Sequence, residues 1–94
     1  MLQSRTTSKF WECYDRLPQS VRKQADRAYK LFSENAYHPS LQFKSIRKAT
    51  KPVFSVRIND DCRTLGVRED DVIVWFWIGS HSAYEALLKR INKT

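Results

Sequence analysis

Three basic side chains, Lys44, Arg57 and Arg63, come from three successive predicted strands. Antiparallel neighbours lie about 4.8 Å apart, so such strands can gather the three charges on one face as a cluster of phosphate size. Arg57 is the best placed of the three, because it alternates with Val56 and Ile58, which are expected to face the core. The pattern therefore indicates a site for a phosphate group.

His81 follows the most apolar predicted strand and opens the last predicted helix. Imidazole groups change protonation near neutral pH, so this residue can accept or donate a proton in a reaction. If the last helix starts as early as His81, Tyr84 shares its helix face and can order the ring or stack on a base. Both have structural alternatives, His81 as a helix cap and Tyr84 as a core residue. For His38, which precedes Pro39 in a loop, the commoner role is a hydrogen bond that fixes the turn.

The arginines have a structural alternative as well. Asp60, Asp61 and Glu69 lie close enough in sequence to form surface ion pairs with them. Lys44 can equally be a solvated strand lysine. Further basic residues in the connection between two strands are expected to contact phosphates without reading sequence. These residues are Arg47, Lys48 and Lys51.

Two consecutive helices are predicted before the strands. The first begins after Thr6 or Thr7, either of which can cap it, and ends at Leu17, because the residue before Pro18 is pushed out of the helical region. The second runs from Gln19 to about Glu34, with apolar side chains at helical spacing and basic ones mostly off that stripe. Together they predict an antiparallel helical hairpin with a charged outer side.

The character of the chain then changes. Nothing helical is expected to restart before Leu41, and strands are predicted over 41–46, 53–58, 62–67 and 72–78, with turns at 59–61 and 69–71. The last strand has no polar face, which predicts a central position covered on both sides. A final helix follows, which either Ser80 or Ser82 can cap. The fold class is therefore α+β, with the helical hairpin packed on a three- to four-stranded, mainly antiparallel sheet and a C-terminal helix.

Length and composition predict a single domain over residues 1–94. Seventeen Lys and Arg against ten Asp and Glu give a net charge of +7, which is typical of a nucleic-acid binder but also fits solubility and an acidic protein partner. No apolar stretch approaches membrane-spanning length and no signal peptide is evident, so a cytoplasmic location is expected. Cys13 and Cys62 lie far apart, without metal-ligand spacing, and with two glycines no phosphate loop is possible; no metal or cofactor is expected.

Four segments taken in order resemble the RelE/ParE superfamily of type II toxin-antitoxin toxins. They are His38-Pro39-Ser40-Leu41, Phe54-Ser55-Val56-Arg57-Ile58, the strand from Cys62 to Arg68, and Trp75-Phe76-Trp77-Ile78-Gly79-Ser80-His81. The resemblance implies a cognate antitoxin that wraps across the toxin. It also implies one of two activities: RelE-like toxins cleave messenger RNA on the ribosome without a metal, and ParE-like toxins poison DNA gyrase.

The resemblance also assigns roles. Arg63 matches an arginine that stabilises transition-state charge, although Cys62 replaces the aromatic residue that normally precedes it. His81 falls where RelE-like toxins carry a basic residue or a histidine, whereas the position that matches their catalytic tyrosine holds Leu87. The favoured hypothesis is a ribosome-dependent messenger-RNA endonuclease. A gyrase inhibitor or an inactive antitoxin-binding module is the alternative. The catalytic residues would be His81, Arg63, Arg57 and Tyr84, and the RNA-binding residues Lys44, Arg47, Lys48, Lys51 and Arg68.

Overall fold

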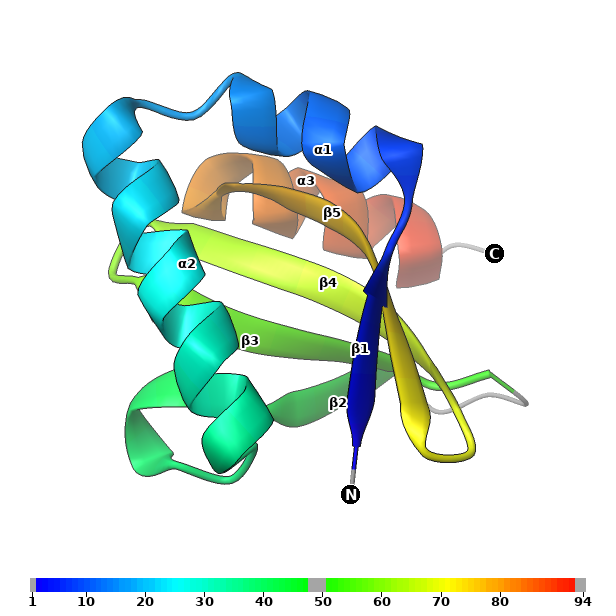
Figure 1. Cartoon of the computed structure of the whole chain (residues 1–94). Helices are drawn as coiled ribbons and strands as arrows, with labels where there is room; N and C mark the ends of the chain where they lie inside the picture. The colour runs from blue at the N-terminus through cyan, green and yellow to red at the C-terminus, as the bar shows by residue number, and fades with distance from the viewer. Residues whose placement is uncertain (1, 48–50, 93–94) are drawn as a thin grey trace.

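A five-stranded sheet lies between helices in the computed structural model, which describes residues 2–47 and 51–92 (Figure 1). The elements in chain order are β1 (Gln3–Thr6), α1 (Ser8–Asp15), α2 (Gln19–Glu34), the short 3₁₀ helix η1 (Pro39–Leu41), β2 (Lys44–Arg47), β3 (Val53–Asn59), β4 (Cys62–Glu69), β5 (Val72–Ser80) and α3 (His81–Asn92). The predicted α+β class, the two N-terminal helices and the C-terminal helix are confirmed.

The two N-terminal helices begin where local chemistry places them. The Thr7 side chain caps α1 by accepting a hydrogen bond from the Phe10 N–H at 3.1 Å, and Pro18 directly precedes α2. Helix α2 buries Ala25, Ala28 and Phe32 against the sheet. Beyond the turn at Pro18 the helices diverge, with α1 across one end of the sheet and α2 running down its face (Figure 1).

The strand order is β1-β5-β4-β3-β2, antiparallel throughout except for the parallel pair of β1 and β5. The sequence does not predict β1, because Gln3–Thr6 is polar and mostly exposed and its pairing is supplied by the backbone of β5. The predicted central position of β5 is wrong by one place, since β4 occupies the middle. The continuous apolar run of β5 has another cause: α1 lies on one side of this strand and α3 on the other.

The sheet has two differently covered faces, which we call the α2 face and the α3 face. Val56, Ile73 and Trp75 pack on the α2 face with Phe32. Gly66 lies beneath this cluster, and a Cβ there would stand 2.6 Å from Ile73 Cγ2 and 2.7 Å from Trp75 Cε3. Glycine is thus needed for the aromatic ring to approach the backbone.

The connection before β2 differs from the predicted strand over 41–46. The His38 side chain accepts a hydrogen bond from the Ser40 N–H at 3.2 Å and caps η1. A short helical turn that ends at Leu41 therefore forms where nothing helical was expected. Gln42 then adopts a left-handed conformation with φ of 46°. Strand β2 consequently starts only at Lys44, and the turn-fixing role of His38 is confirmed.

Candidate functional site

The α3 face gathers the three basic residues that the alternation predicts. Arg57 pairs directly with Arg63 across β3 and β4, and Lys44 pairs with Ser55, two residues before Arg57. Residues opposite one another or two apart on a strand share a face, so the register confirms that the three charges lie together. Two arginines placed directly opposite one another repel, and each needs a partner that holds it.

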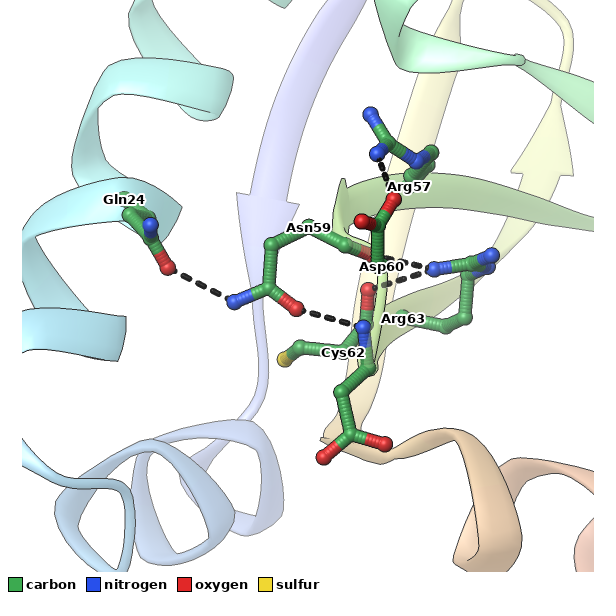
Figure 2. A network of polar contacts seen from close by, with 7 residues as sticks. Gln24, Arg57, Asn59, Asp60, Cys62 and Arg63 are labelled. Carbon is green, nitrogen blue, oxygen red and sulfur yellow. Dashed lines mark hydrogen bonds and ion pairs between the residues drawn. The ribbon is translucent and has the colours of Figure 1, made fainter.

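Arg57 is held by an ion pair. One of its terminal nitrogens contacts the carboxylate of Asp60 in the β3–β4 turn (Figure 2). The ion pair named above as the structural alternative is therefore present at Arg57. The Asp60 side chain is 96% exposed, and a pair this open to solvent contributes little. An incoming phosphate can replace the carboxylate at little cost.

Arg63 is held by neutral groups instead. Its Nη1 donates to the carbonyl oxygens of Asn59 and Cys62, the second at 3.0 Å (Figure 2). Within residues 2–47 and 51–92 it forms no ion pair. The guanidinium is therefore fixed along the turn with its charge uncompensated, which suits it to bind an anion.

His81 is the first residue of α3, which begins directly after Ser80, one of the two predicted caps. Its backbone N–H donates to the Asp61 carbonyl at 2.7 Å, and its ring Nε2 lies 3.0 Å from Glu85 Oε1. The imidazole stacks on Tyr84, with ring centres 5.8 Å apart and planes 27° apart. Tyr84 itself is 6% exposed, so it can orient the imidazole but has little surface with which to touch a substrate.

Arg57, Arg63 and His81 meet at one end of the sheet. Gly79 of β5 faces Arg63, and His81 follows two residues later. The turn between β3 and β4 contacts all three residues, through Asp60, the carbonyls of Asn59 and Cys62, and the Asp61 carbonyl. A turn that contacts two arginine side chains and the backbone of a histidine can support a site that binds a phosphodiester and moves a proton to or from it.

Two of the remaining predicted RNA-binding residues, Lys51 and Arg68, do not join this cluster. Lys51 pairs with Glu69 at 2.8 Å near the other end of β4. Arg68 lies on the α2 face, with its guanidinium carbon 5.9 Å from the Phe54 ring centre. Arg47 belongs to β2, and Lys48 lies outside the described residues. Alternation and strand length separate Lys51 and Arg68 from the site, and their role as general RNA contacts stays a prediction.

Cys62 offers no nucleophile at neutral pH. Both Cys13 and Cys62 are free thiols, and burial raises the pKa of Cys62 to about 11, so that its thiol stays protonated at neutral pH. In the part of the chain that the structure describes, no group of three or more His, Cys, Asp or Glu side chains could hold a metal ion. None of its helices is long and apolar enough to span a membrane.

Two contributors were missed by the sequence analysis. Glu85 stands four residues after His81, and this helical spacing is a signal that could have found it. Asn59 was assigned only to a turn, yet its side chain accepts from the Asp61 N–H at 2.7 Å and donates to Gln24 Oε1 at 2.6 Å. An Asn two residues before a hydrogen-bonded N–H is a known local motif, but the partner on α2 has no sequence signal.

Comparison with known proteins adds the following. Residues 19–86 match the family model of the ParE-like toxin domain. No curated protein sequence matches the chain. Among solved structures, the fold is similar to a RelB–RelE antitoxin-toxin complex from Methanococcus jannaschii, with a TM-score of 0.71, 13% identity, and coverage of 88% of this chain and 96% of that one. YafQ from Escherichia coli has a TM-score of 0.69 and 9% identity, with coverage of 89% of this chain and 98% of that one. The archaeal RelE–RelB complex from Pyrococcus horikoshii has a TM-score of 0.68 and 10% identity, with coverage of 84% of this chain and 93% of that one.

Proposed function

The chain belongs to the ParE-like toxin domain family, and on this premise we propose that it is the toxin of a type II toxin-antitoxin module that cleaves messenger RNA on the ribosome without a metal. One observation carries the proposal: Arg57, Arg63 and His81 are all tied to the same β3–β4 turn. Cationic side chains and a proton-transfer group within one small site are what RNA self-cleavage chemistry requires.

In the proposed reaction the 2′-oxygen bonds to the adjacent phosphorus while the bond from phosphorus to the 5′-oxygen breaks. The 2′-hydroxyl loses its proton and the departing 5′-oxygen gains one, which leaves a cyclic phosphate and a 5′-hydroxyl. His81 serves as the general acid or base, with its ring oriented by Glu85 and Tyr84. Arg63 and Arg57 stabilise the extra negative charge on the phosphoryl oxygens.

The test is primer extension on a defined transcript in a reconstituted translation system. Cuts are expected when ribosomes and toxin are both present and absent when either is left out. In the proposed function the ribosome presents the RNA strand to the site in a fixed conformation. Equal cutting of naked RNA would contradict ribosome dependence, and the absence of any cut would contradict the nuclease proposal.

Inhibition of DNA gyrase is the second candidate, favoured by the match to the ParE-like family. In that case the arginines would bind a protein or DNA surface and His81 would need no proton transfer. Supercoiled plasmid incubated with gyrase and the protein distinguishes the two functions. Accumulation of cleaved plasmid together with intact transcripts would favour gyrase, whereas intact plasmid with arrested translation would favour the nuclease.

We also propose that the antitoxin docks between α1 and α2. A cavity of about 250 Å³ lies there, lined by Phe10, Phe32, Trp75 and other apolar residues. Trp11 and Tyr29 border this cavity and are 47% and 51% exposed. Exposed aromatic residues around an apolar hollow are typical of the central contacts in protein interfaces.

Replacing both Trp11 and Tyr29 with serine is expected to weaken antitoxin binding by roughly 100-fold or more, since each aromatic anchor contributes about 1–2 kcal/mol at such an interface. Isothermal titration calorimetry with the cognate antitoxin measures the change. Tyr37→Ser is the matched control, because Tyr37 is 70% exposed but does not border the cavity. An equal loss in the control, or none in the double variant, would place the antitoxin elsewhere.

A further inference from the structure

The β3–β4 turn is the common support of the candidate site. Arg57 contacts the Asp60 carboxylate, and Arg63 donates to the carbonyls of Asn59 and Cys62 (Figure 2). The backbone N–H of His81 donates to the Asp61 carbonyl. Each of the four residues from 59 to 62 thus supplies one contact to a site residue. A small change in the path of this turn would move all three site residues at once.

This turn lacks the backbone conformation that stabilises most two-residue hairpin loops. Asn59 pairs with Cys62, which leaves Asp60 and Asp61 as the loop. Favoured two-residue loops need positive φ at one or both positions. In the described part of the chain, neither Asp60 nor Asp61 has a positive φ, whereas Asp70 in the next hairpin has a φ of 53°. The ladder also shifts register between Arg57 and Asn59, an irregularity that re-aims the strand end.

The Asn59 side chain provides the missing support from two directions. Its Oδ1 accepts a hydrogen bond from the Asp61 N–H at 2.7 Å, within the turn itself. Its Nδ2 donates to Gln24 Oε1 at 2.6 Å, which fastens the turn to α2 on the other face of the sheet (Figure 2). The first bond closes the loop locally, and the second fixes the loop relative to the rest of the fold.

We propose that Asn59 is a positioning residue of the site: its side-chain amide sets the turn whose carbonyls orient Arg63 and the first residue of α3, His81. The inference deepens the proposed nuclease function and rests on it for its catalytic readout. Asn59 touches no substrate in this scheme. It acts by holding the cation and the imidazole in their relative places, and displacements near 1 Å in such a constellation can cost about 100-fold in rate.

Asn59→Ala is expected to slow cleavage of ribosome-bound RNA by about 10- to 100-fold, while binding of an uncleavable 2′-deoxy transcript changes by less than about threefold. Asn35→Ala is the matched control, because Asn35 Oδ1 accepts from the Tyr37 N–H at 3.1 Å in the same local motif, far from the site. It should lose comparable thermal stability and keep wild-type cleavage. Equal slowing in both variants would overturn the proposal.

Two further variants separate the bonds. Asn59→Asp keeps an oxygen that can accept from the Asp61 N–H, so it should retain the cleavage rate within about fivefold. This variant also tests the proposal if the alanine variant does not fold. Gln24→Ala removes only the link to α2 and should be slowed less than Asn59→Ala. If Asn59→Asp is slowed as much as a variant that lacks the side chain, the proposed role of Oδ1 is wrong.

Amide hydrogen exchange gives a readout that needs no catalysis. The His81 amide should exchange faster in Asn59→Ala than in the wild-type chain, because its acceptor belongs to the supported turn. The amide of Leu65, buried in β4, should be unchanged. Unchanged exchange at His81 would overturn the positioning role. If wild-type protein cuts no RNA but the His81 amide responds as expected, the nuclease function fails and the positioning role stands.

Discussion

The Arg63→Ala variant is expected to cleave ribosome-bound messenger RNA about 100- to 1000-fold more slowly than the wild-type chain, the usual cost of removing one preorganised donor to transition-state charge. Arg63 is fixed by two carbonyls, so little reorganisation is needed when the phosphorus becomes five-coordinate. Single-turnover cleavage with saturating ribosome complex measures the rate. RNA binding should weaken far less than cleavage, because the added charge exists only in the transition state.

Arg68→Ala is the matched control for this experiment. Arg68 belongs to the same strand but lies on the α2 face over Phe54, and its Nε donates to the Asp70 carbonyl. Its loss removes the same formal charge and should leave the cleavage rate within about threefold. If the two variants slow cleavage equally, overall charge rather than a fixed arginine is responsible, and the proposed site fails.

His81→Ala is expected to slow cleavage by about 100- to 10,000-fold, the range that a positioned general acid or base contributes. Multiple-turnover and single-turnover rates should fall together, because the chemical step itself is slowed. Growth arrest on induction should be lost in parallel.

The chain contains its own control for this change. His38→Ala removes the other histidine, whose side chain accepts from the Ser40 N–H and caps η1. This variant should lose some thermal stability and keep its cleavage rate. A His81→Ala protein that remains fully toxic would exclude the imidazole from the mechanism, and toxicity with plasmid cleavage in the presence of gyrase would point to the second function.

Patterns confined to one element were predictable from sequence. The cap at Thr7, the break at Pro18 and the alternation of β3 each depend on neighbours within a few residues, and all three are found in the structure. The parallel strand β1 was not predicted, because its only structural signal is a backbone ladder to residues 72–75. Strand β4 is the middle strand only because β1 pairs with the far edge of β5. The residues of β4 carry no information about that pairing.

The same distinction applies to the site. The shared face of Lys44, Arg57 and Arg63 follows from alternation and a plausible register, so sequence sufficed. Separation of Lys51 and Arg68 from that face depends on exact strand lengths and turn positions, which a charge count ignores. The support given by Asn59 requires Gln24, thirty-five positions away in the chain, and no local pattern links them.

Strand β1 has a consequence for synthesis. Residues 3–6 find their partner only in residues 72–75, so the first strand stays unpaired until β5 has emerged from the ribosome. At about 5–20 residues per second this interval lasts roughly 3 to 14 s. The hairpin that supports Arg57 and Arg63 and the helix that begins at His81 also belong to the second half of the chain. During that interval a newly made molecule has exposed apolar surface on α1 and α2 but no assembled β3–β4 turn, so a partner that recognises those helices can bind it before the candidate site forms.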